Sequence, residues 1–172
     1  AAQLLVDEGG FGNLERPFIY FTRYPHNLGL VYLLAGIFKL FGMLGWADRF
    51  AQAALVCSLL FTVGLLASAR LCRRLGGVQA QTRMLLMFAA FLPFLYCTTE
   101  LYTDAFSLSF SSVIIWSFLK AKDAQSGKRC AGCALLFGLA AFVGAQIRFT
   151  TIIAAIACLI AAFFEKRFKL TA

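Results

Sequence analysis

The sequence predicts an all-α, polytopic helical membrane protein, with about five transmembrane helices and a further helix lying along the outer membrane face. The first observation is composition: 61% of the 172 residues are hydrophobic, 19 are Phe and only 14% are charged. With a mean hydropathy of +0.80, the chain is too apolar for a soluble domain. The second observation is that apolar runs alternate with short basic segments. The net charge of +8 therefore indicates membrane topology and excludes a nucleic-acid surface.

The clearest span covers residues 50–69, twenty residues without a charge, which is about the length needed to cross a hydrocarbon core of about 30 Å. Two further apolar runs flank the acidic stretch, the first with a kink expected at Pro93. The apolar region from 131 to 164 is interrupted only by Arg148; as one helix it would be about 51 Å long, so we expect a tight hairpin there. The predicted spans are 50–69, 84–99, 105–119, 131–147 and 149–164.

Three basic segments set the predicted orientation. Residues 70–83 contain four Arg, residues 120–129 contain four basic residues and one acidic residue, and residues 166–169 form a basic tail. Cytoplasmic loops are enriched in Lys and Arg, so these segments are predicted to be cytoplasmic, which places the acidic stretch at residues 99–104 and Arg148 on the outer face. Several spans are shorter than about 20 residues, so either the helices extend through the acidic stretch or the membrane is locally thin.

Residues 28–44 allow two arrangements. They are apolar enough to span a membrane, but they carry Lys39 and are divided from the next apolar run only by residues 46–49. If they span, residues 1–27 are cytoplasmic; if they lie along the outer interface as a juxtamembrane helix, residues 1–27 are outside with the other polar segments. The charges of residues 1–27 are nearly balanced and do not decide between the two. We favour the interfacial helix.

The expected organisation is a single module that is a fragment of a longer chain. Residues 1–49 form an outer loop with the interfacial helix, and residues 50–172 form the transmembrane helical bundle. The sequence does not begin with Met, and residues 1–6 are too short for the core of a signal peptide. We therefore interpret it as the N-terminal half of a multi-pass protein of the cytoplasmic (plasma) membrane, with its active face outward.

Two carboxylates stand out because ionisable groups at membrane depth are costly and usually functional. Glu100 and Asp104 are four residues apart, so on a helix they share a face and on a loop they can converge on a cation or a hydroxyl. The pair suits metal binding, polar-substrate binding or general-base chemistry. Asp104 is a candidate ligand for a divalent metal, and no other cofactor is indicated. The structural alternative makes Asp104 the N-cap of a helix beginning at Ala105.

Further polar groups lie beside apolar runs at Arg148 and at residues 24–27. A guanidinium can bind a phosphate through two hydrogen bonds while its stem reaches toward the interface, which predicts an anionic head group as ligand of Arg148. The alternative is an Arg that only turns the hairpin at the surface. Tyr24, His26 and Asn27 are candidate substrate contacts beside an aromatic cluster; the alternative for a lone His is a hydrogen-bonded structural group.

Several short motifs follow one another in a characteristic order. Residues 1–6 (AAQLLV) lead into a Gly-rich turn, which is followed by residues 20–30 (YFTRYPHNLGL), by Phe-Gly shortly before Asp48, and by a long apolar run that ends in RRLGG. Residues 101–104 (LYTD) then precede residues 144–153 (GAQIRFTTII). Together these motifs cover most of the chain.

This order resembles the multi-spanning GT-C glycosyltransferases, and in particular the bacterial relatives of the protein O-mannosyltransferases and the aminoarabinose transferases of family 39. Residues 101–104 are similar to the second acidic motif of that family. Residues 144–153 are similar to its later Gly-x-x-x-Lys-Pro-Thr segment, with Arg148 in place of Lys and Phe149 in place of Pro. First outer loops in the family contain juxtamembrane helices, which supports the interfacial placement of residues 28–44.

The resemblance implies a glycosyltransferase that moves a hexosyl or pentosyl group from a polyprenyl-phosphate carrier to a protein, lipid or cell-envelope acceptor on the outer face. The implied partners are the polyprenyl-phosphate-linked sugar, the lipid bilayer and an acceptor protein, lipid or glycan, without nucleic acid. The implied site residues are, for catalysis, Asp104 and Glu100 and, for substrate binding, Arg148, Tyr24, His26, Asn27 and Tyr102.

One departure from the family pattern concerns the principal catalytic Asp, which follows the first span in the family, a region that would precede Ala1 here. We therefore expect the principal base upstream and this piece alone to be inactive. Two other classes remain open. A transporter or flippase for a lipid-linked anion would show inverted repeats and polar groups near the midplane, whereas no repeat is found here. In a non-catalytic membrane scaffold, replacing Asp104 or Arg148 would leave function unchanged.

Overall fold

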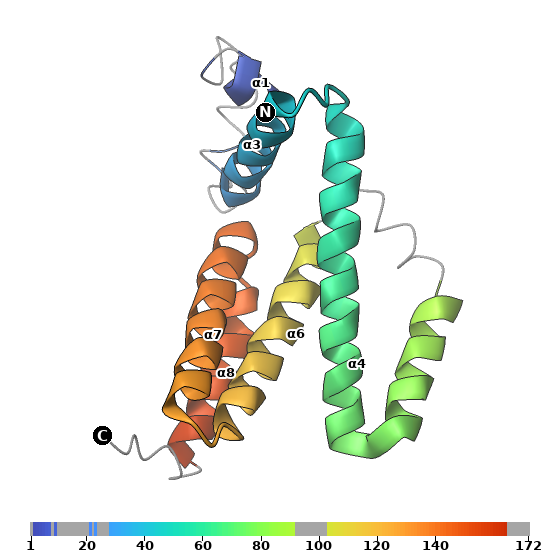
Figure 1. Ribbon diagram of the computed structural model, residues 1–172, viewed down its shortest axis with the longest axis vertical. Coiled ribbons are helices and arrows are strands. Elements are labelled where there is room, and N and C mark those ends of the chain that lie inside the picture. The colour runs from blue at the N-terminus through green and yellow to red at the C-terminus, as the bar shows by residue number, and fades with distance from the viewer. Residues whose placement is uncertain are drawn as a thin grey trace.

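The computed structural model describes residues 2–7, 9, 21, 23, 28–91 and 103–164, and its ordered elements are all helices (Figure 1). No strand occurs among these residues, so the all-α prediction is confirmed for them. The helices are α1 (Ala2–Asp7), α3 (Leu28–Met43), α4 (Arg49–Ala90), α6 (Thr103–Lys122), α7 (Gly127–Ile147) and α8 (Thr151–Phe164).

Helix α4 is two helical limbs joined by a reversal. It begins after Asp48, whose side chain accepts a hydrogen bond from the backbone N–H of Ala51 and caps the first turn. At Gly77 the backbone leaves the helix, with φ of 73° and ψ of −169°, a conformation open to glycine because it lacks a Cβ. The chain then returns alongside the first limb (Figure 1), and the rings of Phe61 and Phe88, 6.4 Å apart, bridge the two limbs.

Helix α6 packs against the first limb of α4 through small residues. A Cβ atom added to Gly64 would lie 2.6 Å from the Cα atom of Ser109, so the backbones approach as closely as two helices can. One turn further on, the hydroxyls of Ser68 and Ser112 share a hydrogen bond of 2.7 Å. These pairs run in the same order along both helices, so α6 is parallel to the first limb of α4.

Two buried clusters hold the helices together. The first joins α1, α3, α4, α6 and α7 at one end of the bundle, and the second joins α6, α7 and α8 further along. In the first cluster Leu34 of α3 packs with Cys57, Phe106 and Ile147. In the second, Ile114 is completely buried. Helix α3 is therefore fixed to the end of the bundle where α4 begins and α7 ends, as Figure 1 shows.

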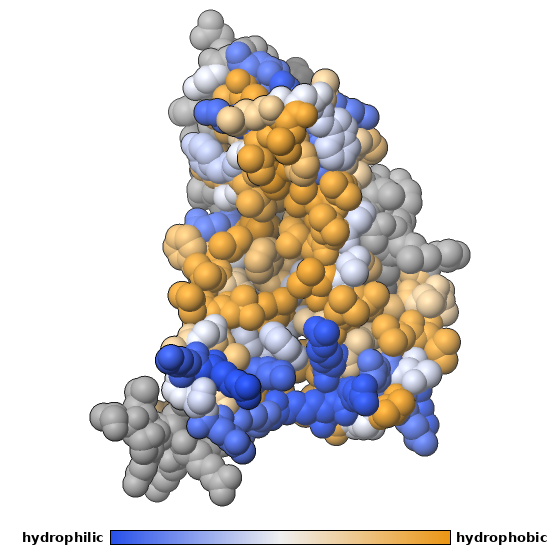
Figure 2. Space-filling view, viewed as in Figure 1, coloured by the Kyte–Doolittle hydropathy of each residue, from blue (hydrophilic) through white to orange (hydrophobic). Residues whose placement is uncertain are grey.

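The outer surface of the helices is strongly apolar. Large hydrophobic side chains such as Leu135, Phe142, Ile153 and Leu159 are more than half exposed. Two helices of the described residues, Arg49–Ala90 and Gly127–Ile147, are long and apolar enough to cross a membrane. Figure 2 shows a broad hydrophobic band above a hydrophilic lower end. The number of spans and the division into an outer loop and a bundle stay predictions.

Candidate functional site

The turn between α7 and α8 presents Arg148. Helix α7 ends at Ile147, and Arg148 is its C-cap, with an extended backbone (φ −151°, ψ 119°) and its N–H donating to the carbonyl of Gly144 over 2.8 Å. The turn leaves the Arg148 side chain half-buried. The apolar region thus reverses direction at this residue, and the C-cap position sets the guanidinium at the end of the bundle.

Thr151 stabilises this turn through its hydroxyl group. Its side chain is completely buried, and its hydroxyl lies 2.7 Å from the carbonyl oxygen of Arg148 and 3.2 Å from that of Gly144. The backbone N–H of Thr151 also donates to the Arg148 carbonyl. Because Gly144 has no side chain, α8 can approach α7 here: an added Cβ would meet the Thr151 methyl at 2.7 Å. The carbonyls of Gly144 and Arg148 are therefore hydrogen-bonded, and the backbone of Arg148 is held in place.

The beginning of α6 reaches the same turn. The hydroxyls of Ser107 and Thr150 are 3.3 Å apart. Ser107 lies three residues after Asp104, so the two positions share a face of α6. Thr150 lies two residues after Arg148. The backbone of Asp104 and the Arg148 turn, more than 40 positions apart in sequence, therefore lie at the same end of the bundle.

The beginning of α3 reaches this end as well. A Cβ atom added to Gly29 would lie 1.9 Å from the carbonyl oxygen of Gln146, so the two backbones touch. Gln146 lies two residues before Arg148, and Gly29 lies two residues after the segment 24–27. The chain that leaves that segment thus starts against the last turn of α7.

The predicted site residues differ in how far the structure describes them. Arg148 is described in full, and Asp104 is placed by its backbone, in the first turn of α6, which begins at Thr103. The structural alternative that made Asp104 the N-cap of a helix starting at Ala105 is therefore wrong. The other predicted site residues lie outside the described residues: Glu100, Tyr102, Tyr24, His26 and Asn27.

An ion pair near this end ties α1 to the start of α4. The Asp7 carboxylate accepts two hydrogen bonds from the Arg49 guanidinium, one of them from Nη1 over 2.6 Å. These hydrogen bonds, with a smaller contribution from the charge of Arg49, lower the pKa of Asp7 below its ordinary value. The same hydrogen bonds raise the pKa of Arg49. Both groups are charged at neutral pH, so the pair is a structural clamp and Asp7 is not set up as a base.

Sequence reasoning passed over two polar groups that matter here. Gln52, just inside the predicted span at 50–69, is almost fully buried; its Nε2 donates to the carbonyl of Trp46, while its Oε1 accepts no hydrogen bond from the described residues. Ser107 links α6 to the Arg148 turn. The available signals were an amide inside a span and a hydroxyl three residues after Asp104; both are uncharged, and the topology argument weighed charges.

The metal prediction at Asp104 gains no partners from the part of the chain that the structure describes. Within those residues, no three His, Cys, Asp or Glu side chains come together as a metal site. The side chain of Asp104 and all of Glu100 lie outside what is described. A metal ligand role for Asp104 stays a prediction.

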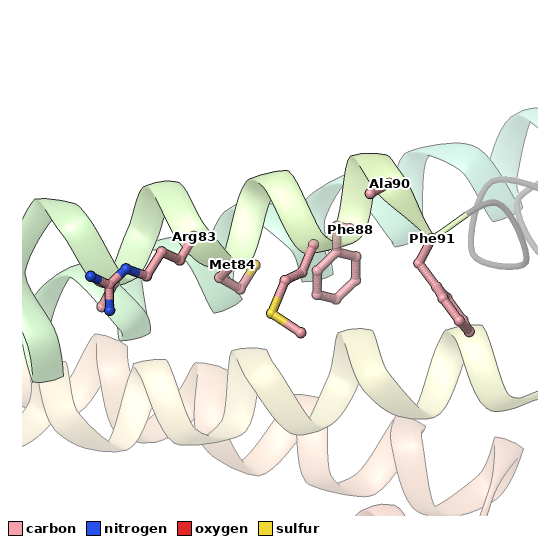
Figure 3. A pocket seen from close by; sticks show the side chains of 7 residues that line it. Arg83, Met84, Phe88, Ala90 and Phe91 are labelled. Carbon is pink, nitrogen blue, oxygen red and sulfur yellow. The ribbon is translucent and has the colours of Figure 1, made fainter.

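A groove of about 680 Å³ follows the second limb of α4 (Figure 3). The rings of Phe88 and Phe91 lie on the same side of this limb, with Arg83 at the far end of the groove. Apart from Arg83, its lining is apolar: Ala80, Met84, Met87, Phe88, Ala90 and Phe91. Arg148 is not among the described residues that line it.

Comparison with known proteins gives one match. A family model described as dolichyl-phosphate-mannose-protein mannosyltransferase matches residues 25–172. The match includes α3 through α8 and every predicted site residue except Tyr24. It confirms the resemblance inferred from the motifs. Searches of curated proteins and of solved structures return no match.

Proposed function

This chain belongs to the dolichyl-phosphate-mannose-protein mannosyltransferase family, and we propose that it forms part of an enzyme that moves a sugar from a polyprenyl-phosphate carrier to a protein, lipid or cell-envelope acceptor. Family membership makes it an integral membrane protein of the glycosyltransferase class. The sugar is a hexose or pentose, transfer takes place on the outer face of the plasma membrane, and the protein crosses that membrane several times.

The observation that carries the proposal is the meeting of three elements at one end of the bundle. The Ser107–Thr150 contact joins the start of α6 to the Arg148 turn, and Gly29 against Gln146 joins the start of α3 to it. A sugar transferase of this kind needs a cation for the carrier phosphate and a carboxylate near the acceptor hydroxyl. Arg148 and the acidic motif are suitable groups for these two tasks.

The proposed role of each residue follows from the chemistry of its side chain. Arg148 binds the carrier phosphate, because a guanidinium matches phosphate oxygens in geometry and charge. Asp104, together with Glu100, accepts a proton from the acceptor or holds a divalent metal. The substrate is contacted by Tyr24, His26, Asn27 and Tyr102.

The proposed orientation rests on charge. The basic segments at residues 70–83 and 120–129 lie at the reversal of α4 and at the α6–α7 connection, the end of the bundle away from Arg148 (Figures 1 and 2). With this end cytoplasmic, Arg148 and Asp104 face outward. Helix α3 then lies at the outer interface, which is supported by its place beyond the end of α7.

The test is sugar transfer by the full-length protein, reconstituted with a polyprenyl-phosphate sugar. We expect Arg148→Ala and Asp104→Asn each to lower transfer roughly 100-fold or more, because each removes a charge used in catalysis or binding. Arg148→Lys keeps the charge but loses the bidentate hydrogen bonding to the carrier phosphate, so this variant retains part of the activity. Arg129→Ala, at the other end of the bundle, is the matched control and keeps full activity.

Full activity of both Arg148→Ala and Asp104→Asn would contradict the proposal and favour a scaffold. Loss of carrier movement across the membrane in these variants, with no sugar transfer by the unmodified protein, would favour a transporter. A raised KM for the carrier with kcat retained in Arg148→Lys would support the phosphate role of Arg148.

A further inference from the structure

The end of the bundle where α4 reverses carries half of the 16 basic residues of the chain. Residues 70–83 and 120–129 contain eight basic residues and a single acidic one, Asp123. Asp123 is already paired, its Oδ2 lying 2.6 Å from Nη1 of Arg74. Arg74 also donates to the carbonyl of Leu119 at the end of α6. These contacts join both segments into one cationic surface, the blue lower end of Figure 2.

Two of these cations lie over one aromatic ring. The guanidinium carbon of Arg70 is 5.9 Å from the centre of the Trp116 ring, and Nζ of Lys120 is 5.7 Å from it. Each distance is within the range of a cation–π contact. Trp116 therefore gathers two positive charges, one from α4 and one from α6. Arg70, Trp116 and Lys120 form what we term the cationic seat.

An apolar groove of about 240 Å³ lies between α4, α6 and α7. Val63 of α4, Val113 of α6 and Leu136 and Leu139 of α7 are among its lining residues, and Ser109 is the one polar side chain among the described residues that line it. A groove of this lining is suited to a hydrocarbon chain, because it offers almost no hydrogen-bonding partner to a polar ligand.

The groove and the cationic seat are aligned along the same helix faces. Val63 lies seven residues before Arg70, and Val113 lies seven residues before Lys120. Seven residues are close to two turns, so each pair shares a face and is separated by about 10 Å along the axis. Because α4 and α6 run parallel here, the seat lies about 10 Å beyond the groove on both helices. Leu66, between them on α4, is half exposed and continues the apolar surface.

We propose that this is a binding site for an anionic glycerophospholipid, with its phosphate at Arg70 and Lys120, its backbone beside Trp116 and one acyl chain in the groove. The bilayer supplies such a molecule at high concentration, and the charge of the surface is complementary to it. Trp is enriched at this depth because its ring is apolar and its N–H is polar. The site lies at the end of the bundle away from Arg148, and it does not depend on sugar transfer.

The test is lipid binding to the full-length protein in neutral detergent at about 0.15 M salt, read by native mass spectrometry. Phosphatidylglycerol and phosphatidylcholine with identical acyl chains are added in competition. We expect a preference for phosphatidylglycerol. Arg70→Gln combined with Lys120→Gln lowers that preference roughly 25-fold, at about five-fold for each cation.

The matched control is Lys128→Gln combined with Arg129→Gln, which removes the same charge from the same end without touching Trp116. In this control the preference for phosphatidylglycerol falls about three-fold or less, because salt screens charges that do not contact the lipid. Val63→Phe fills the groove without changing charge and lowers binding of both lipids. Val63 is half exposed, so this variant keeps the unfolding temperature of the unmodified protein.

Four results would overturn the proposal. An equal loss of the phosphatidylglycerol preference in the two double variants would mean that the lipid is attracted to the whole cationic surface and not to Arg70 and Lys120. Equal binding of the two lipids by the unmodified protein would remove the role of the anionic headgroup. Displacement of phosphatidylglycerol by an equimolar polyprenyl phosphate would assign the site to the carrier lipid. Unchanged binding in Val63→Phe would place the acyl chain elsewhere.

Discussion

At the scale of single residues, a missing Cβ atom decides how closely the helices approach. Gly64 faces Ser109, where an added Cβ would come within 2.4 Å of the hydroxyl oxygen and 2.6 Å of the Cα atom. The second contact is with backbone, which cannot move aside without separating α4 from α6. Gly138, on an exposed face of α7, has no atom within 4 Å of the same added carbon.

Gly64→Ala is therefore expected to destabilise the fold by about 1–3 kcal/mol, the usual cost of overpacking. Gly138→Ala is expected to be neutral or stabilising by up to about 1 kcal/mol, because Ala favours a helix over Gly. Thermal unfolding of both variants in the same detergent measures the difference. Equal unfolding temperatures would contradict the close contact at Gly64.

A second residue-scale prediction concerns Thr151, whose buried hydroxyl bonds the carbonyls of Gly144 and Arg148. Thr151→Val has nearly the same shape and leaves both carbonyls without that donor, so it is expected to cost about 1–3 kcal/mol. Thr62→Val is the control, because Thr62 is exposed and its hydroxyl bonds only within its own helix. The free energy of unfolding of the two variants is the measurement, and a larger loss in Thr62→Val would contradict the argument.

At the scale of elements, the attachment of α1 to α4 depends on one ion pair between Asp7 and Arg49 and on burial of Ala2 in the first core cluster. The hydrogen bonds from Arg49 lower the pKa of Asp7, so Asp7 is ionised and the ion pair is fully formed above the ordinary pKa of 3.8. Its contribution is lost as the pH falls through the lower pKa of the folded state. The attachment therefore responds to acid and not to physiological changes of pH.

We expect the distance between spin labels at Gln3 and Phe50, two exposed positions, to stay constant between about pH 5 and 8 and to broaden only below pH 3.8. Pulsed electron paramagnetic resonance in nanodiscs measures this distance. In Asp7→Asn the distance is broad at every pH. A transition near pH 6 in the unmodified protein would show that another group controls the attachment.

At the scale of the whole molecule, the two ends of the bundle differ in the polar and charged residues that they carry. One end gathers Arg148, the start of α6 and the start of α3, and the other gathers the basic segments at residues 70–83 and 120–129. Between them lies the apolar band of Figure 2. The proposed function has its chemistry at the first of these ends and the cytoplasmic basic segments at the other.

Single cysteines introduced into a cysteine-free full-length protein test this arrangement. With an impermeant thiol reagent on intact cells, we expect Arg23→Cys and Tyr102→Cys to be labelled from outside, and Lys128→Cys only after lysis. Labelling of position 102 from outside, with position 23 labelled only after lysis, would mean that residues 28–44 span the membrane. The predicted site would then lose one of its three elements.

The candidate site was predictable as a set of residues at one membrane face, and not as a set of contacts. Arg148 was identifiable because it alone interrupts a long apolar region, and the acidic motif because carboxylates are costly beside apolar runs. Ser107 and Thr150, which connect the two, carry no charge and gave no such signal. The same is true of Gly29, whose importance depends on Gln146, a residue more than 100 positions away.

The sequence by itself determined the all-helical class and the membrane family, because apolarity along the chain and the order of short motifs are properties of neighbouring residues. It also placed one reversal within residues 70–83 and another near Arg148; the structure locates the first at Gly77 and the second at Arg148. Only the tertiary structure decided which polar groups meet. Contacts such as Ser107 with Thr150 and Arg70 with Trp116 join helices through packing of their faces, and that packing depends on small residues such as Gly64 whose partners lie far away in sequence.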